Sequence, residues 1–92
     1  KFVGMFLNDK SYEELVTAMK NGDRAAAFRA AHTLKGVCGN LSLDKLFNSA
    51  SELTELLRPE SDVIPEGAEA LLANVTRDFE TTVDAIKKFL EA

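Results

Sequence analysis

The ten residues AHTLKGVCGN, at positions 31–40, place side chains that could do chemistry beside residues that a helix normally avoids. They include His32, the one histidine of the chain, and two glycines, Gly36 and Gly39. The segment has helical periodicity, and each glycine inside a helix costs about 1 kcal/mol relative to alanine. Close approach of another molecule is a reason for a helix to tolerate a glycine. For Gly39, a frayed helix end is the simpler alternative.

His32 lies between two basic residues at helical spacing. A neutral imidazole is a nucleophile, and a phosphoryl group bound to it would carry strong negative charge. Lys35 falls on the same helix face, with Cβ atoms roughly 5–6 Å apart, so its ammonium could reach phosphoryl oxygens. Arg29, three residues before His32, is a weaker candidate for the same role. The residues alone leave open that His32 has no task and that both cations belong to a solvated helix face.

A helix with 3.6 residues per turn places the apolar residues of this segment on one side and His32 on the other. The predicted buried face consists of Leu34, Ala30, Leu41 and Val37, with Ala27 and Cys38 at its edge. His32 is therefore expected to face solvent. The small residues beside it are Ala25, Gly36 and Gly39. Phe28 is the one large apolar residue on that side.

Amphipathic helices are expected along the whole chain, and no alternating strand pattern occurs. The predicted helices cover residues 1–7 (the end of a helix whose start is missing), a segment between Ser11 and Gly22, and residues 24–40, 43–58 and 66–90. Ser11 and Glu14 have the spacing of a capping box, Gly22 suits a helix stop, and Asp23 suits an N-cap. A loop over residues 58–67 holds both prolines. Short connections between such helices predict an all-α, antiparallel up-and-down four-helix bundle with a shorter N-terminal helix.

Composition narrows the class of protein. Of the 92 residues, 46% are hydrophobic and 28% are charged, which suits one folded domain over residues 1–92. The net charge of −4 argues against a nucleic-acid partner, and no apolar run is long enough to span a bilayer. A single cysteine fits the reducing cytoplasm. Because the chain begins at Lys1 within an apolar helical pattern, we expect it to be cut from a longer protein.

The residues also argue against an enzyme active site. A hydrolase or an oxidoreductase would need partners for His32, but the chain has no second histidine, one cysteine, and no glycine-rich phosphate loop. A metal site lacks ligands for the same reason. Cys38 is expected to be a small core residue rather than a reactive thiol.

The segment AHTLKGVCGNLSL resembles the core motif of histidine-containing phosphotransfer (HPt) domains. That motif reads approximately His-x-Leu-Lys-Gly, two small residues, Gly, Asn, an aliphatic residue and Gly. The matching residues are His32, Leu34, Lys35, Gly36, Gly39, Asn40 and Leu41. The preceding KNGDRAAAFRAA is similar to the Ala-rich lead-in of the family. Ser42 departs from the pattern, since the family usually has glycine there.

This resemblance implies a helical bundle that accepts a phosphoryl group on His32 and exchanges it with the aspartate of a response-regulator receiver domain. In that family Lys35 would stabilise the phosphoryl group. Gly36 and Gly39, with Phe28 and Arg29, would form the surface on which the receiver docks. The domain would hold no cofactor or metal, because the receiver supplies Mg²⁺, and it would have no kinase active site of its own.

Domains of this family occur free or at the end of hybrid sensor histidine kinases. Because the chain begins within a helical pattern, we expect the second, a parent kinase that can itself be membrane-anchored. A phosphotransfer domain of a chemotaxis kinase is a related possibility, although its glutamate-bearing pattern is less like HTLKGVCGN. The main alternative is a helical adaptor, or an HPt-like bundle that binds partners without being phosphorylated. That alternative predicts binding that is indifferent to the chemistry of His32.

Overall fold

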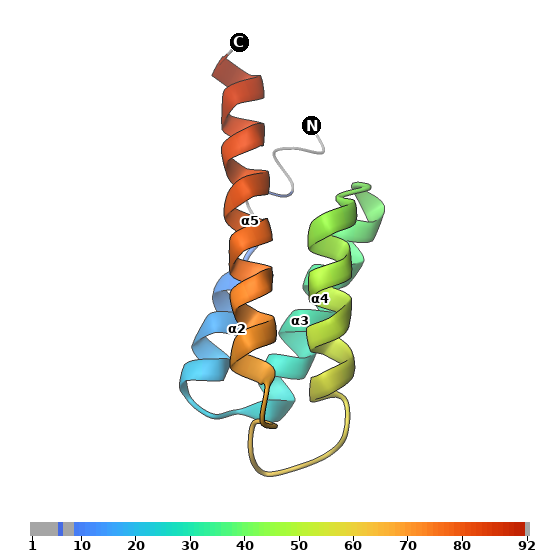
Figure 1. The fold of residues 1–92 in the computed structure, drawn as a ribbon, viewed down its shortest axis with the longest axis vertical. Coiled ribbons are helices and arrows are strands. Elements are labelled where there is room, and N and C mark those ends of the chain that lie inside the picture. The colour runs from blue at the N-terminus through green and yellow to red at the C-terminus, as the bar shows by residue number, and fades with distance from the viewer. Residues whose placement is uncertain (1–5, 7–8, 92) are drawn as a thin grey trace.

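The computed structural model describes residue 6 and residues 9–91. The described helices are α2 (Ser11–Lys20), α3 (Arg24–Asn40), α4 (Asp44–Leu57) and α5 (Ala68–Glu91). Successive helices run in opposite directions and each packs against the next (Figure 1). The predicted all-α, antiparallel up-and-down four-helix bundle is confirmed. The helix predicted over residues 1–7 lies outside the described residues, except for Phe6, which is helical and buried.

The turn between α2 and α3 follows from two residues that the sequence analysis singled out. The amide of Gly22 donates to the carbonyl of Met19 at 3.2 Å, and that of Asp23 donates to Ala18 at 2.9 Å. This Schellman pattern needs a residue with positive φ, and Gly22 supplies it at +69°. Asp23 then caps α3, because its carboxylate accepts from the amide of Ala26 at 3.0 Å. Both the predicted stop and the predicted cap are confirmed.

The helix α3 ends in the same pattern, but with a serine in the position of the glycine. The amide of Leu43 donates to Cys38 at 3.0 Å, and that of Ser42 donates to Gly39 at 3.3 Å. Ser42 has a φ of +58°, a conformation that is unfavourable for a residue with a Cβ atom by roughly 1–2 kcal/mol. The backbone of this turn therefore explains why a glycine suits position 42.

Three boundary predictions need correction. The capping box is wrong: α2 has Lys10 at its N-cap with no side-chain cap, and Ser11 lies inside the first turn, where its hydroxyl donates to Asp9. The last helix begins at Ala68 rather than at residue 66, because Gly67 has a φ of +90°, which a right-handed helix cannot contain. The helix α4 begins and ends one residue inside its predicted bounds.

Aromatic contacts close the bundle by joining α2 to α5. The ring of Tyr12 stacks on that of Phe79 with centroids 4.0 Å apart, and its hydroxyl shares a hydrogen bond of 2.9 Å with the hydroxyl of Thr76. Phe6 packs on the same Phe79 ring at 5.6 Å. The core is completed by fully buried side chains from all four helices: Leu15, Ala27, Ala31, Leu34, Cys38, Leu46, Ala50, Leu53, Leu57, Ala68 and Val75.

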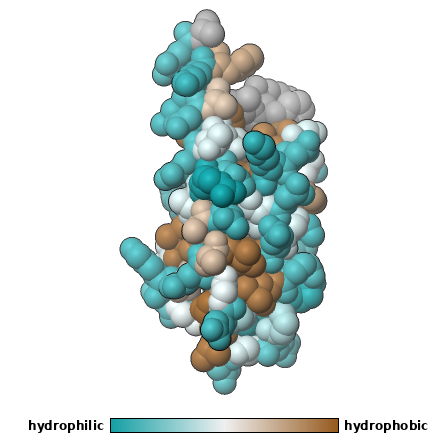
Figure 2. Space-filling view, viewed as in Figure 1, coloured by the Kyte–Doolittle hydropathy of each residue, from teal (hydrophilic) through white to brown (hydrophobic). Residues whose placement is uncertain are grey.

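The apolar stripe predicted for the last helix is buried over only part of its length. Val75 is fully buried, whereas Leu72, Phe79, Val83 and Ile86 are half-buried, and Leu90 is 60% exposed. The C-terminal end of α5 projects past the end of α4 (Figure 1). Figure 2 shows an apolar area beside the lower half of α5 and mainly hydrophilic residues along its upper half. None of the helices in the described part of the chain has the length and apolar character that crossing a membrane needs.

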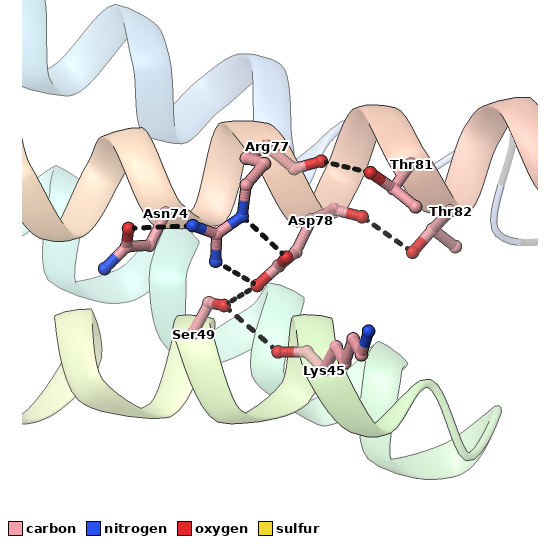
Figure 3. A network of polar contacts seen from close by, with 7 residues as sticks. All are labelled: Lys45, Ser49, Asn74, Arg77, Asp78, Thr81 and Thr82. Carbon is pink, nitrogen blue, oxygen red and sulfur yellow. Dashed lines mark hydrogen bonds and ion pairs between the residues drawn. The ribbon is translucent and has the colours of Figure 1, made fainter.

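A polar cluster joins α4 to α5 (Figure 3). The hydroxyl of Ser49, which is buried, donates to the carboxylate of Asp78, and Arg77 donates to the same carboxylate at 3.2 Å. The backbone carbonyl of Asp78 accepts from the hydroxyl of Thr82 at 2.7 Å. The hydrogen bond from Ser49, followed by that from Arg77, holds the pKa of Asp78 below its ordinary value. The carboxylate therefore remains charged and is enclosed by its partners.

Candidate functional site

His32 lies near the middle of α3 with an exposed side chain, as the helical periodicity predicts. Its ring stacks on that of Phe28, one turn earlier, with centroids 6.0 Å apart and planes inclined by 18°. No hydrogen bond joins the imidazole to another of the described residues. The ring is therefore supported on one side by an aromatic neighbour while its nitrogens are open to a ligand.

The buried face of α3 is rotated relative to the prediction. The buried residues of this helix are Arg24, Ala27, Ala30, Ala31, Leu34 and Cys38. Val37 and Leu41, which were predicted to be buried, are only half-buried. The reason is that α3 packs against both α2 and α4, so the buried arc is broader and centred closer to Ala31. His32 remains outside this arc.

Lys35 lies at the border between the buried and exposed faces of α3. It is half-buried, and its Nζ is 5.9 Å from the centroid of the Phe47 ring of α4. An ammonium over an aromatic face is attracted by the negative charge density of the ring. Phe47 thus draws the cation toward α4, on the side of His32 that faces that helix.

The two glycines of the motif have different surroundings. A Cβ atom on Gly36 would meet no atom within 4 Å, whereas one on Gly39 would lie 3.2 Å from the ring of Phe47. Gly36 therefore leaves open space one turn beyond His32. Gly39 is inside the helix rather than at a frayed end, and its small size makes room for Phe47. The structure thus adds a packing reason for Gly39 that helical periodicity does not reveal.

Arg29 lies on the opposite flank of His32 from Lys35. It is exposed, and it borders a shallow surface depression between α2 and α3 together with Glu14, Ala26, Ala30 and Thr33. The structure therefore brings His32, Phe28 and Gly36 together on one surface, with Lys35 toward α4 and Arg29 toward α2. We call this surface, formed by those five residues, the His32 surface.

Two residues at the C-terminal end of α4, Glu55 in its last turn and Arg58 at its C-cap, lie beside the His32 surface and were missed by the sequence analysis. Arg58 lies with its Cζ 5.3 Å from the centroid of the Phe28 ring, and it pairs with Glu55 at 2.7 Å. The hydrogen bond from Arg58 is the main cause that lowers the pKa of Glu55, and the charges of Lys35 and His32 lower it further. One signal in the sequence could have revealed this ion pair. Glu55 and Arg58 have opposite charges and are three residues apart at the end of their helix, a spacing at which side chains meet.

A buried arginine holds this end of α4 against α3. Arg24, in the first turn of α3, is only 9% exposed, and its guanidinium donates to the carbonyls of Leu57 at 2.6 Å and Ser61 at 2.9 Å. The carbonyls at a helix C-terminus have no partner within the helix, so an arginine there satisfies them and complements the helix dipole. Arg24 therefore fixes the position of the α4 terminus that carries Glu55 and Arg58.

The other reactive groups of the described residues are poorly placed for chemistry. Cys38 is fully buried, and burial is the main cause that raises the pKa of its thiol to about 12. The thiolate, which is the nucleophilic form, is therefore scarce near neutral pH. No three His, Cys, Asp or Glu side chains in the described ranges lie close enough together to hold a metal ion. The exposed imidazole is thus the best-placed nucleophile.

Similarity to a known family extends over almost the whole bundle. The Hpt domain model matches residues 4–89, which include α2, α3, α4 and nearly all of α5. No curated protein and no solved structure matches the chain. The match covers far more than the segment around His32, and the four described helices have the expected arrangement. The chain therefore belongs to the Hpt domain family, whose members are phosphotransfer modules of two-component phosphorelays that interact with response-regulator receiver domains.

Proposed function

We propose that this chain accepts a phosphoryl group on His32 and exchanges it with the aspartate of receiver domains. The observation that carries the proposal is the exposed imidazole of His32, which has no hydrogen-bond partner among the described residues and lies one turn from the open space at Gly36. A nucleophile in such a position is reachable by a second protein. Membership of the Hpt family supports phosphoryl transfer as the chemistry of that contact.

The reaction needs little from this chain beyond the nucleophile and positive charge. The lone pair of an unprotonated imidazole nitrogen forms a P–N bond while the P–O bond to the aspartate of the receiver breaks. The bonding electrons leave with that carboxylate, and the other ring nitrogen keeps its proton. Lys35 would neutralise part of the charge on the phosphoryl oxygens, since catalysis of phosphoryl transfer rests mainly on positioning and electrostatics. The receiver would supply Mg²⁺, so the chain acts as a carrier rather than a kinase.

Docking of the receiver would use the His32 surface. Gly36 leaves space in which the backbone of a partner could approach the imidazole. The ring of Phe28 and the side chain of Arg29 extend the same surface beyond the histidine. Gly39 would contribute indirectly, because its small size lets Phe47 pack beneath Lys35.

The proposal is tested by transfer from phosphorylated receiver domains, with Gly36→Gln as the informative variant. Glutamine is a good helix former but projects a long side chain beside His32. We expect Gly36→Gln to be at least as stable as the wild-type chain, to lose most transfer from receivers, and to react normally with the small donor phosphoramidate. Ala85→Gln, which adds the same side chain to an exposed position of α5, is the matched control and should transfer normally.

Two results would contradict the proposal at different points. Wild-type transfer rates in Gly36→Gln would show that receivers do not dock over Gly36. Failure of the wild-type chain to accept phosphate from every receiver and from phosphoramidate would show that it is not a phosphoryl carrier.

A further inference from the structure

The last turn of α4 and the middle of α3 meet on a single aromatic ring. The ring of Phe28 stacks on the imidazole of His32 at 6.0 Å between centroids, and the guanidinium of Arg58 lies 5.3 Å from the same ring. A planar guanidinium stacks on aromatic rings and binds phosphate oxygens in pairs. The ring thus keeps a flexible cation beside the nucleophile without a direct bond between them.

Glu55 occupies the hydrogen-bonding groups of that cation. Arg58 donates to the two carboxylate oxygens of Glu55 through Nε at 3.1 Å and through a terminal nitrogen at 2.7 Å. The two side chains are 52% and 59% exposed. Exposed ion pairs of this kind are weak because water competes for both partners. The guanidinium can therefore leave Glu55 when a more highly charged acceptor comes within reach.

We infer that Arg58 is a second cation, besides Lys35, for the phosphoryl group on His32. While His32 is unmodified, Glu55 binds the guanidinium of Arg58 instead. This inference rests on the proposed function. A phosphoryl group carries nearly two negative charges and offers three oxygen acceptors, whereas the carboxylate carries one charge. Phosphorylation of His32 would draw the guanidinium across the Phe28 ring, from Glu55 to the phosphoryl oxygens. Arg58 would then act from the C-cap of α4 while Lys35 acts from α3.

The pair would also set how readily His32 holds its phosphoryl group. Arg58 attracts the phosphoryl group, and Glu55 opposes it in two ways, by repelling the phosphoryl charge and by competing for the guanidinium. Removal of Arg58 should therefore favour return of the phosphoryl group to the receiver. Removal of Glu55 should favour its retention on His32.

The experiment compares the wild-type chain with Arg58→Gln and Glu55→Gln. In each, His32 is first phosphorylated by phosphoramidate, a small donor that needs no docking surface, and two quantities are then measured. The first is the pKa of the phosphoryl group on His32, followed by ³¹P NMR. The second is the equilibrium constant for exchange with a receiver, which does not depend on how fast the two proteins dock. We expect Arg58→Gln to raise the phosphoryl pKa and to shift the equilibrium roughly three- to tenfold toward the phosphorylated receiver. Glu55→Gln should change both quantities in the opposite direction. Arg58→Lys keeps the charge but loses the planar guanidinium, so its values should lie between those of the wild type and Arg58→Gln.

Matched controls separate this effect from a general change in charge. Arg77→Gln and Glu80→Gln remove one exposed charge of each sign from α5, and both should behave as the wild-type chain. Equal phosphoryl pKa values in the wild type, Arg58→Gln and Glu55→Gln would overturn the inference and leave the carrier function standing. Failure of the wild-type chain to become phosphorylated would overturn both.

Discussion

The two faces of α3 differ in what surrounds each side chain. On the buried face, Leu34 and Cys38 are enclosed by other helices, with 1% and 0% of their surface exposed. On the exposed face, His32 has an aromatic neighbour on one side and solvent on the other. A Cβ atom added to Gly36 would meet no atom within 4 Å. The same helix therefore carries residues whose size is set by packing and residues whose size leaves room for another molecule.

This difference separates stability from function along one helix. A change on the buried face alters the packing of the core, so its cost appears in the free energy of unfolding. A change on the exposed face removes few contacts and should leave that free energy nearly unchanged. If the assignment of faces is correct, each variant of α3 should affect mainly one of the two properties.

The largest expected effect on stability is that of Leu34→Ala. Truncation of a buried leucine leaves a cavity, and we expect a loss of roughly 2–5 kcal/mol in the free energy of unfolding, measured by chemical denaturation. Lys35→Ala, at the next position, should cost less than about 1 kcal/mol because its side chain lies at the border of the exposed face and should instead slow phosphoryl transfer. An equal loss in both variants would show that the faces are wrongly assigned.

Cys38 probes the buried face by its reactivity. Its thiol is fully enclosed, and burial followed by the negative charge of Asp9 raises its pKa to about 12. At pH 8 we expect a thiol reagent to label the native chain at least about a hundredfold more slowly than the unfolded chain, because thiolate is the reacting form. Labelling at the same rate in both states would show that this face is open to solvent.

Ser42 marks the point where the chain leaves α3. Because its φ is +58°, Ser42→Gly should relieve the strain of the Cβ atom and raise the free energy of unfolding by about 1 kcal/mol. Ser42→Ala is the control, since it also removes the hydroxyl but keeps the Cβ atom, and it should give no such gain. Equal stability of the glycine and alanine variants would mean that the turn is not strained at this position.

The smallest effects come from alanine at the two glycines. Gly36→Ala should raise the free energy of unfolding by somewhat less than 1 kcal/mol, through helix propensity and the lower entropy of the unfolded chain. Gly39→Ala should gain less, because its methyl group would lie 3.2 Å from the Phe47 ring and would force that ring to move. Thermal denaturation of the two variants measures the difference. An equal gain in stability in both variants would show that Phe47 does not require a glycine at position 39.

Most of the fold could be predicted from local sequence because it depends on local signals. Helical periodicity predicts the helices, while Gly22 and Asp23 determine the turn that makes α3 antiparallel to α2. The exposure of His32 follows from its position opposite the apolar residues of α3. The wrong capping box at Ser11 shows the limit of such signals, because Asp9 competes for the same hydroxyl.

Contacts between helices could not be predicted in the same way. The positions of Glu55 and Arg58 beside Phe28 depend on the rotation of α4 about its own axis, which no short motif specifies. A buried arginine such as Arg24 is also unexpected from sequence, because charged residues are mostly exposed unless their donors are paired. The exposure of the His32 imidazole was therefore predictable, whereas the positions of Arg58 and Glu55 beside it were not.

The most direct test of the carrier function compares the wild-type chain with His32→Gln, after incubation with phosphoramidate or with a phosphorylated receiver. We expect the wild-type chain to take up phosphate in a bond that is lost in acid and survives base, as a phosphoramidate does. The His32→Gln variant should take up none, although its free energy of unfolding should change by no more than about 0.5 kcal/mol because the residue is exposed. Undiminished labelling of a folded His32→Gln variant would contradict the assignment of His32 as the phosphoryl acceptor.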